Sequence, residues 1–291
     1  MKTIVIIHNL NSRGKNINEN YVRELLNKKG IKFHYFQTKQ ISDVDEIIKK
    51  YNNPSEFQYC SIGGDGSLNA LVNSLMKNNI TMPEVSCLPG GSGSDFIRTF
   101  ALPQNIEQAV EHLNYDNFYE VDVGLIKNKT DAKYFINVLN IGFLASTVEV
   151  SEKFPNLFRA FRYPLSFWIK IITARAKEMT ISNDKYEFKG MAFNICVCNA
   201  QYFGGGWNIS PKSSLQDGLF NIQVFAVTKL KAMQIFFLAK KGLHLKESSV
   251  KLKRLSQLTV NSKDPIEIDG DFFGYGPAEI FIKKRAIRFK I

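Results

Sequence analysis

The sequence is poor in cysteine and has no long apolar run. Its four cysteines form no Cys-x-x-Cys pair, which argues against a disulfide framework and against a two-cysteine metal site. The apolar run at residues 4–7 is too short for a signal peptide, and no stretch approaches the length of a membrane span. We therefore expect a cytoplasmic protein whose thiols are buried. Its 291 residues fit two domains.

Acidic residues are also fewer than basic residues. The chain has 27 Asp and Glu against 38 Lys and Arg, which gives a formal net charge of +11. This balance favours an anionic partner, such as a nucleotide or a phospholipid surface. The basic residues are mostly dispersed and no familiar nucleic-acid-binding module is visible, so we expect no nucleic-acid partner.

The most informative stretch is the glycine-rich loop Gly63-Gly64-Asp65-Gly66-Ser67-Leu68-Asn69. It follows the apolar run 57–62, which predicts a buried strand, and it opens a segment with apolar residues at helical spacing. Strand, glycine loop and helix form a geometry in which backbone N–H groups and a positive helix end converge on an anion. Asp65 would repel a bare phosphate, so it needs a Mg²⁺ ion or a substrate hydroxyl as its partner. Alternatively, Asp65 only fills a turn.

The order of the predicted elements indicates two kinds of domain. Up to about residue 118, strands alternate with helices, which predicts a parallel α/β sheet with ligand loops at the carboxyl ends of its strands. Beyond this point strand-like runs follow one another with few helices, which predicts a largely antiparallel β domain. We therefore expect an α/β domain at residues 1–118 and a β-rich domain at residues 119–291. The expected strands of the second domain are 121–126, 135–141, 190–200, 219–227, 258–268 and 279–291.

One segment, residues 157–177, combines large apolar side chains with regularly placed cations. It is either a helix that rests on anionic lipid or covers a lipid cleft, or a helix that faces the core and has a solvated basic side.

Several blocks resemble, in the same order, the motifs of the diacylglycerol kinase catalytic superfamily, which includes bacterial lipid kinases and sphingosine kinases. Together they span nearly the whole chain. The blocks are the loop at 63–69, Asn9–Lys15 (Asn-Pro-x-Ser-Gly in the family), Leu88–Arg98 (Pro-x-Gly-Thr-x-Asn-Asp-Phe), Phe135–Phe143, Asn199–Leu219 and Ile266–Asp271 (Asp-Gly-Glu). The chain departs from these patterns at Leu10, Arg13, Ser92, Ser94, Ala200 and Asp271.

The resemblance implies an ATP-dependent lipid kinase. It would transfer the γ-phosphoryl group to a hydroxyl of diacylglycerol or a similar lipid, in a cleft between a three-layer parallel α/β domain and an antiparallel β-sandwich. Asp65 would organise Mg²⁺ and the phosphates, and Asp271 would orient or deprotonate the acceptor hydroxyl, with Asp269 as the other acid of that turn. The nucleotide-binding residues would be Asn9, Thr38, Gly63, Gly64, Gly66, Ser67, Asn69 and Ser92.

The same resemblance implies a structural Mg²⁺ ion at the Asp-Gly turn of residues 217 and 218. Its ligands would be Asp217 and the backbone carbonyls of Ser214 and Leu219, which are oxygen ligands that suit a hard cation. Alternatively, the turn needs no metal. The lipid substrate would be presented at a membrane surface, with peripheral membrane association, and homodimer formation stays open.

Two other functions also stay open at this point. A NAD kinase-like enzyme, which phosphorylates a soluble nucleotide, shares a Gly-Gly-Asp-Gly loop. A non-catalytic lipid-binding relative would fit the departures from the family patterns. The blocks at 204–217 and 269–271 favour the lipid kinase.

Overall fold

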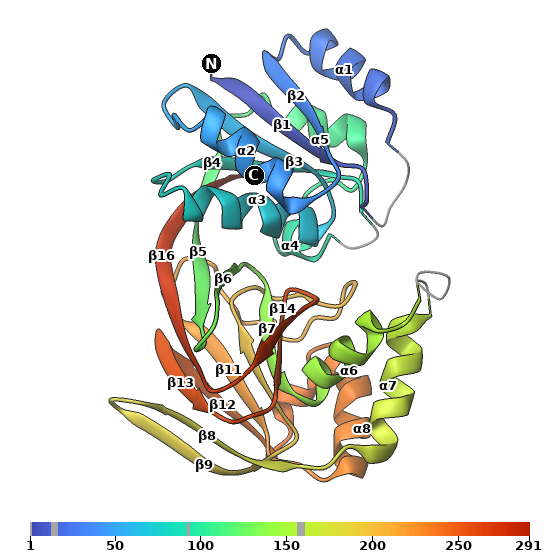
Figure 1. The fold of residues 1–291 in the computed structure, drawn as a ribbon, viewed down its shortest axis with the longest axis vertical. Helices are drawn as coiled ribbons and strands as arrows, with labels where there is room; N and C mark the ends of the chain where they lie inside the picture. Colours follow the sequence, from blue (N-terminus) through green and yellow to red (C-terminus); the bar gives the residue numbers. More distant parts are fainter. Residues whose placement is uncertain (1, 13–16, 92–93, 156–160) are drawn as a thin grey trace.

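The computed structural model describes residues 2–12, 17–91, 94–155 and 161–291, and it shows two units stacked along the long axis of the molecule (Figure 1). In the first unit, four parallel strands lie in the order β2-β1-β3-β4. They are β1 (Thr3–Asn9), β2 (Phe33–Thr38), β3 (Phe57–Gly63) and β4 (Glu84–Pro89). Its helices are α1 (Glu19–Lys28), α2 (Ile41–Lys50), α3 (Asp65–Lys77), α4 (Asp95–Thr99) and α5 (Ile106–His112).

Helices cover both faces of this sheet, so the unit has three layers. Alternate residues of β1 serve the two sides: Val5 and Ile7 share a buried cluster with α2, α3 and α4, whereas Ile4 and Ile6 share another with α1 and α5. Burial on both faces is why the central strands are almost uninterrupted apolar runs. Helix α2 follows the N-cap residue Gln40, whose N–H donates to Asp43 Oδ2 at 3.2 Å.

The second unit is a sandwich of antiparallel strands. One layer is a six-stranded sheet in the order β12-β11-β10-β7-β14-β15. Its strands are β7 (Val138–Gly142), β10 (Asn194–Cys198), β11 (Phe220–Phe225), β12 (Val250–Leu255), β14 (Pro265–Ile268) and β15 (Asp271–Tyr275). The facing layer contains β5 (Phe118–Lys127), β6 (Ala132–Phe135), β8 (Lys177–Asn183), β9 (Tyr186–Ala192), β13 (Gln257–Asn261) and β16 (Ala278–Lys290). Side chains of both layers form one buried cluster between them.

Three helices cover the outer face of the six-stranded sheet. They are α6 (Phe143–Glu152), α7 (Arg162–Thr173) and α8 (Lys229–Ala239), followed by a 3₁₀ turn at Leu243–Lys246 (Figure 1). Phe167 of α7 and Ile235 of α8 share a buried cluster with Cys196 and Cys198, which lie on one face of β10. The four cysteines are free.

Strand β16 joins the two units. It pairs with β5 along most of its length, and its last residues pair in parallel with β4. Phe289, near the carboxyl end, is fully buried; it packs edge to face against Phe96 and stacks on Phe100 of the first unit. The chain therefore passes into the second unit along β5, close to the predicted boundary at residue 118, and returns along β16 to complete the first core.

The predicted fold class, a parallel α/β unit followed by an antiparallel sandwich, is confirmed. The run predicted at 190–200 is divided between β9 and β10, which belong to different sheets. Strands β8, β12 and β15 were not predicted. They carry mostly exposed or half-buried side chains, so the sequence shows no continuous apolar run there.

Candidate active site

Two glycine loops meet at the carboxyl ends of β3 and β4. The Gly90 N–H donates to the carbonyl of Gly63 at 3.0 Å. A Cβ atom on Gly91 would lie 2.3 Å from the Cα atom of Gly64, and one on Gly63 would lie 2.2 Å from Ser67 Oγ. The backbones therefore pack at a separation that only glycine permits, and the amino end of α3 stays open to an anion.

The loop after β1 is tied to both glycine loops. Asn9 Nδ2 donates to Ser67 Oγ at 3.0 Å, and Ser12 Oγ donates to the carbonyl of Gly90 at 3.1 Å. The structure thus brings Asn9, Ser67 and the glycines together, as their order in a parallel sheet predicts. Ser92 lies outside the described residues.

Thr38 and Asn69 are buried at the edge of this site and bind neighbouring segments of the chain. Thr38 is 2% exposed, and its hydroxyl donates to the His8 carbonyl at 3.4 Å. Asn69 is 4% exposed, and its Nδ2 donates to the Tyr134 carbonyl at 3.1 Å and to Asp269 Oδ2 at 2.8 Å. Contact of these two side chains with a nucleotide stays a prediction.

Asp65 binds the start of another helix. Its two carboxylate oxygens accept the N–H groups of Asp95 and Phe96, both at 2.9 Å. The side chain of Ser94, the N-cap residue of α4, makes no capping hydrogen bond. Asp65 therefore supplies the cap from 30 residues away, a role that the sequence did not suggest.

Asp95 is a second, more deeply buried acid beside Asp65. It is 4% exposed, and its Oδ2 accepts the Gly205 N–H of the second unit at 2.8 Å. Burial raises the pKa of this carboxyl, and the charge of Asp65 adds to the effect. No hydrogen-bond donor in the described part of the chain reaches Oδ1, and Arg98 Nε lies 3.8 Å away. A carboxylate oxygen without a donor, beside a second carboxylate, fits a Mg²⁺ ion that arrives with a nucleotide.

The turn between β14 and β15 faces this site from the second unit (Figure 1). Asp269 anchors the turn, because its carboxylate accepts the N–H groups of Ile136, Asn137 and Val138 at 2.8 to 3.0 Å. Burial raises the pKa of Asp269 to about 6, although these donors act in the opposite direction. With the bond from Asn69, this one carboxylate links β14, the β6–β7 connection and α3.

Asp271 is the accessible acid of the turn. Its side chain is 59% exposed and lies 3.4 Å from Lys133 Nζ. The assignment of Asp271 as the base stays a prediction.

Glu267 is a third acid of this turn, and sequence reasoning did not assign it a role. It is 4% exposed, its Oε2 accepts Asn140 Nδ2 at 2.7 Å, and its Oε1 accepts the Gly270 N–H at 2.5 Å. Burial raises the pKa of its carboxyl to about 8. The signal available in the sequence was an acid between two isoleucines, Ile266 and Ile268. In the structure this strand, β14, lies between β7 and β15, which buries the acid.

The predicted structural metal site has a different arrangement. Asp217 Oδ1 accepts the Leu219 N–H at 2.9 Å, and Oδ2 forms an ion pair with Arg254. The neighbouring Asp122, which sequence reasoning missed, is fully buried and accepts the N–H groups of Gly218 and Arg285, both at 2.7 Å. With Arg254 paired to Oδ2 and the Leu219 N–H bound to Oδ1, the Asp217 carboxylate is not arranged as a Mg²⁺ ligand. The backbone carbonyls of Ser214 and Leu219 as metal ligands stay a prediction.

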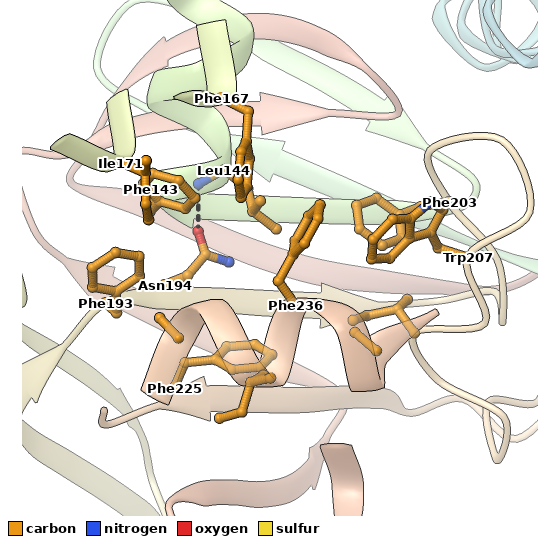
Figure 2. A pocket seen from close by; sticks show the side chains of 14 residues that line it. Phe143, Leu144, Phe167, Ile171, Phe193, Asn194, Phe203, Trp207, Phe225 and Phe236 are labelled. Atoms are coloured by element: carbon orange, nitrogen blue, oxygen red, sulfur yellow. Dashed lines mark hydrogen bonds between the residues drawn. The ribbon is translucent and has the colours of Figure 1, made fainter. Parts of the chain in front are cut away.

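A small apolar cavity of about 50 Å³ lies between the six-stranded sheet and its helices (Figure 2). Figure 2 shows Phe143, Phe167, Phe225 and Phe236 around it, with Trp207 at one side. The polar side chain in the lining, Asn194, is bound to the Leu144 N–H at 3.0 Å. The rest of the lining is apolar. Among the helices described, none is long and apolar enough to cross a membrane.

Comparisons with known proteins agree with this arrangement. The family model described as "Diacylglycerol kinase catalytic domain" matches residues 3–126, and "YegS C-terminal NAD kinase beta sandwich-like domain" matches residues 137–290. The chain belongs to the diacylglycerol kinase-like family of bacterial lipid kinases.

Two relatives and one solved structure illustrate the similarity. The chain is 28% identical to a diacylglycerol kinase of Staphylococcus haemolyticus over 77% of this chain and 68% of that protein. It is 26% identical to a diacylglycerol kinase of Staphylococcus carnosus over 97% and 92%. A crystal structure of a diacylglycerol kinase from Bacillus anthracis superposes with a TM-score of 0.74 at 18% identity, and the match covers 99% of this chain and 96% of that one. At this identity the superposition supports the fold alone.

The buried acid Glu267 leads to a prediction about pH. Because its pKa rises from 4.5 in the unfolded chain to about 8 in the folded protein, the folded protein holds a proton that the unfolded chain releases. Between these values the free energy of unfolding should fall as pH rises, by at most about 1.4 kcal/mol per pH unit. Glu267→Gln, which stays neutral, should flatten this dependence.

Thermal unfolding from pH 5 to pH 8 measures the effect, with the exposed Glu279→Gln on β16 as the control. Parallel curves for the wild type and Glu267→Gln would show that Glu267 is ionised throughout this range.

Proposed function

We propose that the protein is an ATP-dependent lipid kinase that transfers the γ-phosphoryl group of ATP to a hydroxyl of diacylglycerol or a similar lipid. The observation that carries this proposal is the position of the acidic β14–β15 turn opposite the two packed glycine loops. The bond of 2.8 Å between Asn69 Nδ2 and Asp269 Oδ2 fixes the two facing parts. The names of the relatives support the same reaction.

On the nucleotide side, the protein would bind the phosphates mainly through backbone N–H groups and would hold them in position. The open amino end of α3 and the glycine loops bind phosphate oxygens, and the polar side chains of Asn9 and Ser67 line the same edge of the sheet. A bound Mg²⁺ ion would be held by Asp65 and Asp95 and would neutralise charge on the phosphates. Since Asp65 also caps α4, the amino end of that helix is held beside the phosphates.

On the acceptor side, Asp271 would orient the lipid hydroxyl and accept its proton. Its exposed carboxylate is free to move away from Lys133, whereas Asp269 is fixed by the three backbone N–H groups. Asp269 would therefore position the turn, and Asp271 would contact the substrate. Positioning and charge neutralisation supply most of the catalysis in phosphoryl transfer.

The lipid chain would enter between the helices that cover the six-stranded sheet. The apolar cavity beneath α7 and α8 would have to widen, because about 50 Å³ is too small for an acyl chain. The outer sides of the same two helices carry exposed apolar residues: Leu165, Trp168, Ile169 and Ile172 on α7, and Leu230 and Phe237 on α8. We call these six residues the α7–α8 apolar face.

The charge around the α7–α8 apolar face favours an anionic bilayer as its partner. The two described segments that contain these helices, residues 161–175 and 228–246, hold several lysines and arginines and no aspartate or glutamate. Apolar side chains flanked by cations are typical of helices that lie in the membrane interface. Peripheral membrane association would bring the cavity beneath α7 and α8 to the lipid.

Incubation with γ-labelled ATP and a mixed lipid extract tests the reaction. The expected product is a labelled phospholipid. Labelled NADP, formed when NAD is added, would indicate the NAD kinase-like alternative. An absence of any labelled product from folded protein that binds ATP would indicate the non-catalytic relative.

Two variants separate the roles of the acids. Asp65→Asn should lower kcat by about a hundredfold or more, because charge stabilisation of the phosphates is lost. Asp271→Asn should also abolish most lipid phosphorylation but leave ATP binding nearly intact, and Asp271→Glu should remain active.

Calorimetric ATP binding and single-turnover kinetics measure these effects, with Asp184→Asn, an exposed acid of the β8–β9 turn, as the control. Normal turnover by folded Asp65→Asn would reduce Asp65 to a helix cap. Weaker ATP binding with normal turnover of bound substrate in Asp271→Asn would contradict its assignment as base.

The α7–α8 apolar face gives a prediction for membrane binding. The double substitution Trp168→Ser and Leu230→Ser should weaken binding to phosphatidylglycerol vesicles about tenfold or more, since burial of each large apolar side chain is worth about 1.5–3 kcal/mol. Vesicle co-sedimentation measures the binding. A matched control replaces two exposed apolar residues elsewhere, Ile41 and Leu252, with serine. Equal losses in both double variants would place the docking surface outside these helices.

A further inference from the structure

Two carboxylates meet at the Asp-Gly turn before β11. Asp217 belongs to the turn itself, and Asp122 reaches it from β5 and accepts the Gly218 N–H. We propose that Arg254 and Lys284 take the place of a resident divalent cation at this turn, so that the second unit folds and remains stable without a structural metal. This inference concerns stability and does not depend on the proposed kinase activity.

Arg254 is brought to Asp217 by strand pairing. In the antiparallel register of β11 and β12, Arg254 lies opposite Asn221, at the end of β11 that follows the turn. Its guanidinium forms an ion pair with Asp217 Oδ2, while Oδ1 accepts the Leu219 N–H. Both oxygens of this carboxylate are therefore engaged by groups of the chain itself.

Lys284 is brought to the same turn by an irregularity in β16. The register of β16 with β5 shifts between Lys283 and Ile287, and Arg285 adopts a positive φ of 49°. The Arg285 N–H consequently donates to Asp122 Oδ1 at 2.7 Å. The Lys284 side chain runs over Gly218, where its Nζ would lie 3.0 Å from a Cβ atom added to that glycine. Burial raises the pKa of the Asp122 carboxyl, and the charge of Lys284 acts in the opposite direction.

The charges at the turn balance without an ion. The carboxylates of Asp122 and Asp217 face the cations of Arg254 and Lys284, so a bound Mg²⁺ would leave an excess of two positive charges. Mg²⁺ also requires several oxygen ligands in near-octahedral geometry, whereas Asp217 Oδ2 is paired with the guanidinium of Arg254 and Asp122 is fully buried. A resident ion would have to displace Arg254 and repel Lys284.

Thermal unfolding of the nucleotide-free protein tests this inference. After dialysis against EDTA, the Tm of the wild type should be unchanged to within about 1 °C when millimolar Mg²⁺ is added. The double substitution Arg254→Ser and Lys284→Ser should lower the Tm by a few degrees and create a response in which Mg²⁺ restores it. The matched control Lys129→Ser with Lys263→Ser removes the same charge from exposed positions and should show no response to Mg²⁺.

A wild-type Tm that falls with EDTA and recovers with Mg²⁺ would overturn the inference, as would a folded double variant that gains no response to Mg²⁺. If the double variant does not fold, the single Lys284→Ser variant and calorimetric titration of the wild type with Mg²⁺ decide. The inference is supported if titration of the wild type with Mg²⁺ gives no binding heat and Mg²⁺ raises the Tm of Lys284→Ser. Binding heat in the wild type, or a Tm of Lys284→Ser that Mg²⁺ leaves unchanged, contradicts the inference.

Discussion

The site depends on one recurring interaction, a carboxylate that accepts backbone N–H groups from a segment far away in the sequence. Asp65 binds the start of α4, Asp95 binds Gly205, and Asp269 binds the β6–β7 connection. Hydrogen bonds to charged groups contribute about 1.5–3 kcal/mol each, more than neutral ones, because the donors would otherwise be unsatisfied. These carboxylates hold loops that have little apolar surface of their own. The two units can therefore face each other across a polar boundary without losing a fixed geometry.

Burial of these acids also limits the negative charge that faces the glycine loops. Glu267, Asp269 and Asp271 lie within one short turn that faces the glycine loops. Burial raises the pKa of Glu267 to about 8 and that of Asp269 to about 6, so the first is mostly protonated at neutral pH. The turn then presents less negative charge to the glycine loops than its sequence suggests. A buried, hydrogen-bonded acid gives rigidity here at a lower electrostatic cost.

Much of the fold could be predicted from the sequence, because periodicity reports which face of an element is buried. The alternation of strands with helices before residue 118, and the succession of strands after it, were sufficient to predict both architectures. The exposed strand β12 was not predicted, since the alternation in Val250-Lys251-Leu252-Lys253 is short and only the two end residues of the strand are buried. The return of β16 to the first sheet depends on pairing between residues about 200 positions apart, as in Arg288 with Glu84, and no local pattern reports such pairing.

The candidate site shows the same division. The glycine loops could be predicted from local chemistry, because adjacent glycines indicate a close approach of the backbone. The role of Asp271 rests on the resemblance and stays a prediction. The partners of Asp65 and Asp217 could not, since the donors belong to α4 and β12 and their distance depends on tertiary packing. A motif therefore predicts which types of residue come together, whereas the charged side chains around the motif decide which ligand it binds. Arg254 and Lys284 lie outside every motif block, yet they determine the charge at the Asp-Gly turn. For this chain, the cations that surround an acidic motif are the better guide to whether it holds a metal.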